Sequence, residues 1–561
     1  MIDPNLQPQG SRMNEQNSVK KRIGPVGLLF IGTGSIIGSG WLFAALYAAQ
    51  DAGPSSVVSW ALAAIMLGVI ALVFAELGAA LPLPGGFARY PHVTFGGLTS
   101  FIASWLCWLA YMVIPSVETM AILEYLGNEV PWLITTHQEE RSLSIAGTVI
   151  ASGLLFSLMI INILGVQWVT HSNNVITLWK ILIPIMTGVV LLLYGFQATN
   201  FTEFGLAPKG VSGIFEALAA GGVVFSLLGY RTIVELAGEA RKPQRDVPIA
   251  IFGSLLICTV IFILVQIAFI GVLPPEQLAN GWNGIVIEGA SGPFAAFALL
   301  LGLGWLATIL YIDATISPYG TALIFTSSSA RLVLAMGKNR NVPGFFSRIS
   351  SRGIPVRALV VNWMVGMMLL APLPGWDELA GIVSSVAMLT SAVSAIAFLA
   401  LRRSHPELNR PFKAPFPTAC GVVAFVFASL IAYWTGWTVN RTVLLALLGG
   451  LALLALTIPG MNNGKRPLHV RHALWMVPWL GGIFALSWAS DYPGGVGLIK
   501  APWGECLLIA WCLALVPLAM RSALGRERSD ELISGILEEI EEADRHDTDA
   551  ASGEIDARAD S

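Results

Sequence analysis

Ionisable side chains inside apolar runs of about 20 residues, each long enough to cross a bilayer, are the first candidates for chemistry. Lys180 lies in the stretch TLWKILIP, and Asp313 lies in YIDATISP. An ionised group at mid-membrane costs about 3 kcal/mol, so each residue indicates a function. Because burial disfavours the charged form of a lysine, Lys180 is expected to couple solute movement to a proton gradient. Alternatively, its side chain extends to the membrane surface, since polar residues 172–174 are close by.

Asp313 and three further ionisable residues in apolar runs each have more than one possible role. Asp313 could exchange a proton, contact the amino group of a solute, or pair with Arg231 or Lys180. Arg231 and Glu235 are four residues apart, which is the spacing of a local ion pair on a helix. Alternatively, the Arg231 guanidinium binds the side-chain carboxylate of an acidic amino acid through two parallel hydrogen bonds. Glu118 is a candidate for a proton pathway.

The elements that must position these residues are membrane-spanning helices. Of the 561 residues, 55% are hydrophobic and only 12% are charged, against about 25% charged in a soluble domain. Helices satisfy the backbone polar groups inside a bilayer, so we expect an all-α integral membrane protein. The apolar runs predict about 14 spans, at 24–48, 56–82, 98–126, 143–165, 171–194, 213–237, 249–273, 292–325, 355–374, 378–402, 415–437, 441–459, 472–489 and 501–520. Pro318 is expected to break the eighth span, and Glu76, near the end of the second, is expected to be structural.

Basic residues occur in alternate loops, which is typical of cytoplasmic loops. Lys and Arg gather at 20–22, 241–245, 331–352, 402–413, 465–471 and 521–528. We therefore expect a multi-pass protein of the cell membrane with both termini in the cytoplasm, beginning with a cytoplasmic segment at 1–23. The first apolar run is expected to stay in the protein, because it lacks the features of a cleavable signal peptide.

The C-terminal tail, 525–561, is expected to be cytoplasmic and acidic. From Asp530 onward it carries 12 acidic residues and two arginines, a net charge of −10. Leu532, Ile533, Ile536, Leu537 and Ile540 recur at helical spacing, which predicts a short amphipathic helix.

Two glycine-rich stretches predict interrupted helices. Residues 32–41 read GTGSIIGSGW and residues 221–230 read GGVVFSLLGY. Each glycine costs a helix about 1 kcal/mol relative to alanine, and a broken membrane helix is tolerated where it lines a cavity. The new helix start near Ser39 and Gly40 would offer backbone N–H groups to a carboxylate. The alternative is close packing of two straight helices through glycine.

The two breaks lie five spans apart, so the second helix enters from the opposite side. Matching breaks in two inverted halves mark the substrate site of a transporter. We expect a ten-helix core at 24–402, made of halves at 24–194 and 213–402, followed by additional transmembrane helices at 403–524.

At these motifs the chain resembles the amino acid–polyamine–organocation permeases. GSIIGSG at 34–40 is similar to their first-helix signature, FSLLGY at 225–230 to their sixth, and GEARKPQRDVP at 238–248 to the following loop. The resemblance implies a LeuT-type inverted-repeat fold with helices 1 and 6 broken and with alternating access. It also implies a lysine near the first and eighth helices, a position that matches Lys180.

Within that family, the bacterial aspartate–proton symporter branch is the most similar. The stretches GSGWLF at 38–43, AELGAALP at 75–82 and LGWLAT at 303–308 look like that branch. One departure is Arg231, which stands where family members commonly have an acid after the glycine–aromatic pair. This arginine puts generic neutral amino acid specificity in doubt.

The expected site combines these inferences. The substrate-binding residues are Ser35, Ile36, Ile37, Gly38, Ser39, Gly40, Phe225, Ser226, Leu227, Gly229 and Arg231; the proton-coupling residues are Lys180 and Asp313; the gate residues are Phe225, Tyr230 and Trp305. We expect no catalytic residue, metal or cofactor, because the sequence has neither a phosphate-binding loop nor a His–Glu metal motif.

The expected function is proton-coupled uptake of an acidic amino acid, aspartate or glutamate. The expected partners are the amino acid, protons rather than sodium, and the lipid bilayer, with no nucleic acid. Alternatives are a neutral amino acid permease, an amino acid exchanger, and a membrane sensor that binds the solute without moving it.

Overall fold

The computed structural model describes residues 23–83, 85–127, 129–137, 140–164, 167–285, 292–350, 353–370, 375–461 and 468–538. Most of the expected N-terminal segment and the tail beyond residue 538 therefore lie outside the described residues.

Helices dominate the part of the chain that the structure describes. Residues 25–195 hold α1 (Pro25–Ile36), α2 (Gly40–Ala52), α3 (Ser56–Ala80), α4 (Gly86–Phe95), α5 (Gly97–Leu126), α6 (Ile145–Leu164) and α7 (Gln167–Gly195). Residues 210–404 hold α8 (Gly210–Ala219), α9 (Val223–Leu227), the 3-10 turn η5 (Leu228–Tyr230), α10 (Arg231–Glu235), α11 (Pro243–Val272), α12 (Pro293–Leu300), α13 (Gly304–Lys338), α14 (Val356–Leu370) and α15 (Trp376–Ser404). The last part holds α16 (Pro417–Trp434), α17 (Gly436–Met461), α18 (Val470–Ala473), α19 (Met476–Ala489) and α20 (Trp503–Arg521).

A short antiparallel hairpin joins α5 to α6, which the all-helical prediction missed. Its strands are β1 (Ile134–His137) and β2 (Glu140–Leu143), with Ile134 opposite Leu143. It lies in a loop between spans. Water can satisfy backbone groups there, so the chain need not be helical.

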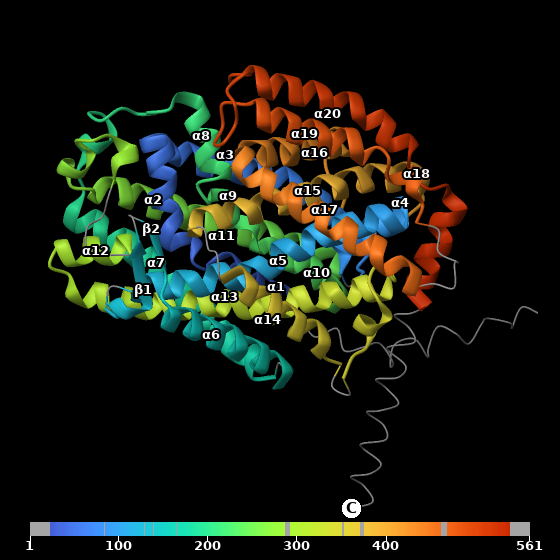
Figure 1. Ribbon diagram of the computed structural model, residues 1–561, viewed down its shortest axis with the longest axis horizontal. Coiled ribbons are helices and arrows are strands. Elements are labelled where there is room, and N and C mark those ends of the chain that lie inside the picture. Colours follow the sequence, from blue (N-terminus) through green and yellow to red (C-terminus); the bar gives the residue numbers. More distant parts are fainter. Residues whose placement is uncertain are drawn as a thin grey trace, which may run out of the picture.

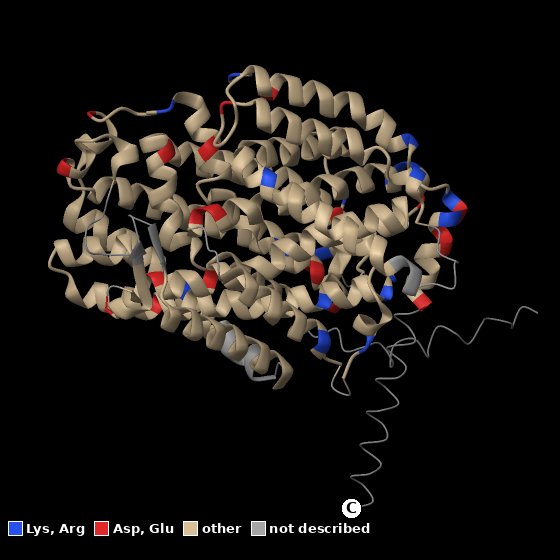
Figure 2. Cartoon of the chain, in the orientation of Figure 1, with Lys and Arg blue, Asp and Glu red and all other residues tan. Residues whose placement is uncertain are grey.

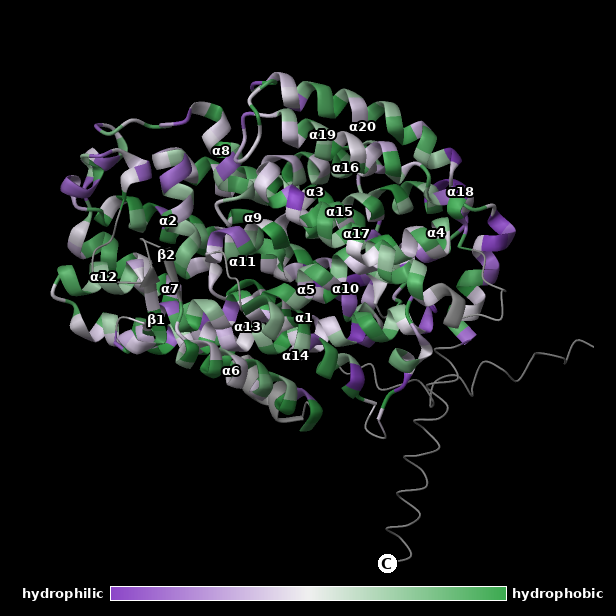
Figure 3. Ribbon diagram, viewed as in Figure 1, coloured by the Kyte–Doolittle hydropathy of each residue, from purple (hydrophilic) through white to green (hydrophobic). Residues whose placement is uncertain are grey.

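Most of the long helices lie side by side in one bundle, with α19 and α20 along one side and α6 along the other (Figure 1). The central helices are α5 and α15, whose most apolar windows are 94% buried, whereas those of α6, α17 and α20 are 33% buried. Hydrophobic residues follow the helices along their length, and hydrophilic ones gather at the two ends of the bundle (Figure 3). Outer helices that expose so much apolar surface indicate contact with lipid, so this is a multi-pass membrane protein.

The number of membrane crossings stays a prediction. Among the described residues, nine helices are long and apolar enough to cross, or ten if the bent pair Gly210–Ala219 and Val223–Glu235 is one span. Each of the expected spans, about 14 by length, coincides with a helical segment. Several fall short of the full length, such as α14 with 15 residues and α19 with 14.

The expected eighth span differs from the observed one in two ways. The predicted range 292–325 falls on α12 and α13, which are separated by a turn at Gly302, where φ is +72°. The predicted break at Pro318 is wrong, because α13 continues through it to Lys338. Neighbouring helices and side chains can satisfy the backbone group that a proline frees inside a membrane helix.

Buried Glu76 on α3 fixes the turn that leads from α15 to α16. Its two carboxylate oxygens accept hydrogen bonds from Nε and Nη2 of Arg402, each at 2.8 Å, and Oε2 accepts the backbone N–H of Ala414 at 2.8 Å. Arg410 Nε lies 3.2 Å from Glu76 Oε1. The structural role predicted for Glu76 is confirmed.

The bundle has one basic end, where Lys and Arg gather near α4, α10 and α18, while acidic residues are frequent at the opposite, acidic end (Figure 2). Residues 526–538 form a helix at the basic end, on which Ile536 is buried. This confirms the predicted amphipathic helix as far as residue 538; Ile540 lies outside the described residues.

Candidate functional site

Both predicted helix breaks are present. The first separates α1, which ends at Ile36, from α2, which begins at Gly40. The second separates α8 from α9 with a bend of 44°, and Gly222 there has a φ of +85° that favours glycine.

The two breaks touch each other through their glycines. A β-carbon on Gly229 would collide with the backbone of Ser35 and Ile36, and one on Gly40 would collide with Ser226. The hydroxyls of Ser35 and Thr232 lie 3.1 Å apart across the same contact. Glycine-mediated packing and helix interruption, which the sequence presented as alternatives, therefore occur together.

A carboxylate already occupies the start of α2. The backbone N–H of Ser39 donates to Glu118 Oε2 at 2.7 Å, and Glu118 on α5 is buried. A β-carbon on Gly38 would collide with the other carboxylate oxygen of Glu118. The break therefore binds a carboxylate where the sequence predicts one, but the carboxylate belongs to the protein.

Lys180 on α7 connects the first break to α13. Its Nζ donates to the Gly34 carbonyl and to Thr321 Oγ1, each at 2.8 Å. The Thr321 hydroxyl faces the carbonyls of Gly34 and Ile37 at 3.1 and 3.2 Å, so these two side chains satisfy carbonyls at the end of α1. Lys180 is 1% exposed, so the alternative of a side chain extended to the membrane surface is wrong.

Asp313 lies two helical turns before Thr321 on the same face of α13. Its Oδ1 accepts hydrogen bonds from Trp179 Nε1 at 2.8 Å and from the Ser317 hydroxyl at 2.6 Å. Among the described residues, Oδ2 has no hydrogen-bond partner. Of the alternatives for Asp313, the direct ion pair with Arg231 or Lys180 is not formed among the described residues, where two neutral donors bind the carboxylate instead.

Arg231 stands away from the contact between the breaks. Its guanidinium carbon lies 4.2 Å from the centre of the Phe87 ring and 5.5 Å from that of Tyr111, and Nη2 lies 3.7 Å from Cys107 Sγ. In the described part of the chain, both Glu235 oxygens and two Arg231 nitrogens, Nε and Nη1, lack hydrogen-bond partners. The predicted local ion pair between Arg231 and Glu235 is therefore wrong for this conformation.

A small central cavity lies between the breaks. It is lined by Ser35, Ile36, Gly40, Ile114, Glu118, Phe225, Ser226, Leu228, Gly229, Thr321 and Phe325. Its volume is about 10 Å³, which is about the space of one water molecule, so this conformation is closed around the site.

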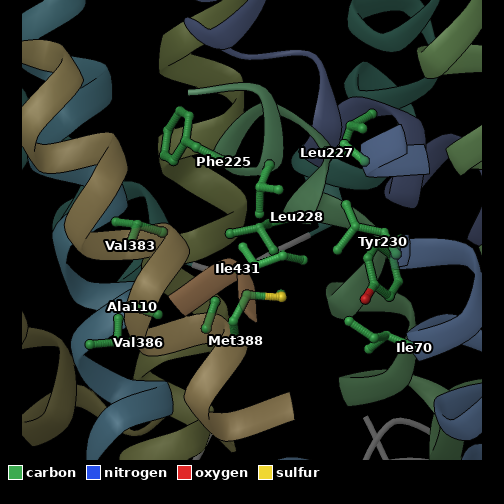
Figure 4. Close-up of a cluster of buried hydrophobic side chains, with 14 of the residues drawn as sticks. Ile70, Ala110, Phe225, Leu227, Leu228, Tyr230, Val383, Val386, Met388 and Ile431 are labelled. Carbon is green, nitrogen blue, oxygen red and sulfur yellow. The ribbon is translucent and has the colours of Figure 1, made fainter. Parts of the chain in front are cut away.

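Six of the predicted substrate-binding residues line this cavity, while Ile37, Gly38, Ser39 and Leu227 flank it and Arg231 lies elsewhere. Figure 4 shows Phe225 and Leu227 projecting to different sides of α9. Sequence reasoning missed Ile114, Leu228, Thr321 and Phe325. Thr321 had a signal, because it shares a helix face with Asp313.

An aromatic cluster covers Phe225 and includes a residue that the sequence did not reveal. The Trp376 ring lies edge-on to Phe225 at 5.4 Å and is stacked with Phe43 at 5.5 Å. Trp376 Nε1 donates to the Ser39 hydroxyl at 2.8 Å. Of the other gate candidates, Tyr230 is buried near Ile70 (Figure 4) and Trp305 is 51% exposed; neither belongs to this cluster.

Within the described ranges, no group of three or more His, Cys, Asp or Glu side chains could hold a metal ion.

The sequence of the chain matches the family model for amino acid permeases over residues 23–455. It is 33% identical over 518 residues to the glutamate/serine transporter AimA of Bacillus subtilis, covering 91% of this chain and 95% of that protein. It is 34% identical over 524 residues to the aspartate-proton symporter of the same organism, covering 92% and 99%. With the branched-chain amino acid permease BcaP it shares 28% identity over 452 residues, or 78% and 93% of the two chains. The chain therefore belongs to the amino acid permease family.

Proposed function

We propose that this protein is a secondary active transporter that takes up an acidic amino acid together with a proton by alternating access. The observation that carries the proposal is the carboxylate of Glu118 on the Ser39 amide, 2.7 Å away. It supports a carboxylate-binding role for this break, in a buried place lined by both interrupted helices. Relatives named as an aspartate-proton symporter and a glutamate/serine transporter favour an amino acid with a second carboxylate.

The Glu118 carboxylate occupies the position that the α-carboxylate of the solute takes when the solute binds. The α-carboxylate of the entering amino acid replaces Glu118 at the start of α2, where the positive end of the helix dipole favours an anion. The Gly40 amide, the first in α2, has no carbonyl within the helix to bond, so it is free to contribute. The central cavity opens by moving the lining side chains, since it is too small for an amino acid as it stands.

Proton coupling is proposed to act through Lys180. In its charged form the ammonium holds the Gly34 carbonyl and Thr321 together, which joins α1 to α13. Loss of a proton leaves a neutral amine, whose hydrogen bonds lack the charge that makes the ammonium's stronger, and so loosens α1 from α13. Movement at the first break thereby depends on the proton occupancy of Lys180.

The basic end of the bundle is proposed to face the cytoplasm. Loops rich in Lys and Arg stay on that side of the cell membrane. Both termini then lie in the cytoplasm, and the aromatic cluster around Trp376 lies on the outward side of the central cavity.

A neutral amino acid permease is the second candidate, and one observation favours it. Much of the central cavity lining is apolar, with Ile36, Ile114, Phe225, Leu228 and Phe325, and the described residues of the lining include neither lysine nor arginine. In that case the side chain of the solute meets no compensating charge at the centre.

Uptake by purified protein in proteoliposomes tests the proposal. Radiolabelled aspartate, glutamate, serine, alanine and leucine are compared under an imposed pH gradient, a sodium gradient, and no gradient. Concentrative aspartate uptake that follows the pH gradient is the expected result. Leucine or alanine uptake without aspartate uptake would establish the neutral permease instead. Uptake of labelled amino acid only when the vesicles contain unlabelled amino acid would indicate an exchanger. Binding without net uptake would indicate a sensor.

A further inference from the structure

A second cavity, of about 320 Å³, lies at the basic end of the bundle. Its lining comes from α4, α6, α10, α13 and the start of α14, and it includes Arg89, Glu235 and Arg331. The volume falls at the lower end of the range for small-molecule sites. It therefore has room for an amino acid, which the central cavity lacks in this conformation.

Two chain segments run from the central cavity to the second one. On α13, Phe325 lines the central cavity and Arg331 lines the second cavity. On the segment from η5 to α10, Gly229 lines the central cavity and Glu235 lines the second. The second cavity thus lies on a route from the contact between the breaks to the basic end.

One layer of side chains closes this route. The Arg231 guanidinium lies over the rings of Phe87 and Tyr111. Tyr111 packs edge-on against Phe325, with ring centres 5.3 Å apart. Since Phe325 belongs to the central cavity and Arg231 stands one helical turn before Glu235, a solute that moves toward the basic end must pass these residues.

Among the described residues, most of the polar atoms of Arg231 and Glu235 lack hydrogen-bond partners, since only Nη2 of Arg231 makes a contact, with Cys107 Sγ. Glu235 is 5% exposed and Arg231 is 1% exposed. In the described ranges, both Glu235 oxygens and the Arg231 Nε and Nη1 atoms make no hydrogen bond. Burying such groups unpaired is costly, and a ligand that supplies the missing partners would account for their arrangement.

We propose that Arg231 and Glu235, with the cavity beside them, form a second amino acid site on the release path. The guanidinium of Arg231 binds the side-chain carboxylate of the acidic amino acid, and the carboxylate of Glu235 binds its ammonium group. Together they match two charges of aspartate or glutamate, at a place where the solute itself separates the layer of rings. This inference rests on the proposed transport function and extends it to the step of release.

Transport measured separately from each face of the membrane tests this second site. Right-side-out and everted vesicles report the KM for aspartate at the acidic and basic ends. Glu235→Gln removes the charge with little change in shape, and Arg231→Lys keeps the charge but loses the planar fork. Because a hydrogen bond to a charged group is lost, we expect the KM at the basic end to rise about tenfold or more. At the acidic end the KM should stay within about twofold, while the maximal uptake rate falls.

Three controls make the outcome decisive. Glu276→Gln removes an exposed carboxylate in the loop between α11 and α12 and should leave both KM values unchanged. Glu235→Asp keeps the charge and should restore part of the affinity at the basic end. Succinate, which has two carboxylates and no ammonium group, should compete at the basic end more weakly than aspartate.

The inference and the proposed function can fail separately. If Glu235→Gln and Arg231→Lys transport aspartate with unchanged KM from both faces, the second site is wrong while the transporter stands. An equal rise in KM at both faces would show a general effect on the protein, which also overturns the second site. No aspartate transport by the wild-type protein under any gradient would overturn the proposed function itself.

Discussion

The contact between the two helix breaks can be tested with a single methyl group. Replacing Gly40 with alanine places a β-carbon 2.7 Å from the Ser226 Cβ and 3.0 Å from its Cα. Carbon atoms in contact prefer about 3.5–4.0 Å, so α2 and α9 must separate by a few tenths of an ångström to about 1 Å. Forcing an extra methyl group into a packed interior costs about 1–3 kcal/mol. The closed conformation is therefore expected to lose about 5- to 150-fold in population relative to conformations in which the breaks are apart.

Radiolabelled aspartate uptake in proteoliposomes gives the readout for Gly40→Ala. We expect the rate of uptake to fall at least fivefold, because transport by alternating access must pass through a closed conformation. The double variant Gly40→Ala with Ser226→Gly removes the atoms that the methyl group strikes, and it should recover most of the loss. Gly68→Ala is a matched control, since no atom of the described residues lies within 4 Å of a β-carbon at Gly68. Uptake by Gly40→Ala within twofold of wild type would refute the view that the two breaks must touch.

Three further substitutions test other parts of the structure. Lys180→Ala should leave a folded protein whose aspartate uptake no longer depends on the pH gradient, and retained pH dependence in proteoliposomes would remove Lys180 from the coupling mechanism. Trp376→Phe keeps the ring contacts but loses the hydrogen bond to Ser39, so the KM for aspartate should rise about fivefold. Trp305→Phe on the surface should leave the KM unchanged, and an equal rise in both variants would support Trp305 as a gate residue. Glu76→Gln leaves Arg402 and Arg410 without their carboxylate and should lower the stability of the folded protein by about 3 kcal/mol, measured as a lower Tm, while an unchanged Tm would contradict the structural role of Glu76.

The sequence predicts those features well in which a local pattern of residues is compatible with only one structure. Apolar runs of membrane length must be helices, because unpaired backbone groups are too costly in lipid. Glycine clusters at 32–40 and 221–229 weaken a helix wherever they occur, and both helices are interrupted there. A lysine inside an apolar run must find buried partners, and Lys180 does so at Gly34 and Thr321.

Partners that lie far apart in the chain escaped the sequence reasoning. Glu118 is 79 residues from Ser39, and Trp376 is 337 residues from it. Neither spacing nor periodicity carries information about such pairs, since they depend on how the helices pack. The same limit applies to one partner of Asp313, the indole of Trp179, which is 134 residues away. Its other partner, the hydroxyl of Ser317, is four residues away at helical spacing.

The position of Arg231 changes how selectivity for an acidic amino acid would arise. An arginine inside the central cavity would select a second carboxylate at the moment of binding. Here the guanidinium lies over the rings of Phe87 and Tyr111, while the described residues that line the central cavity include no lysine or arginine. A charged side chain would then enter the centre at a cost, and the cation would lower the free energy of the later step in which the solute leaves. Selectivity of this kind appears in the rate of passage more than in the affinity at the central cavity. Arg231→Met should accordingly lower the maximal rate of aspartate uptake and leave the external KM for aspartate nearly unchanged. Any serine uptake should show a smaller loss. A rise confined to the external KM for aspartate would instead place the selective contact at the central cavity.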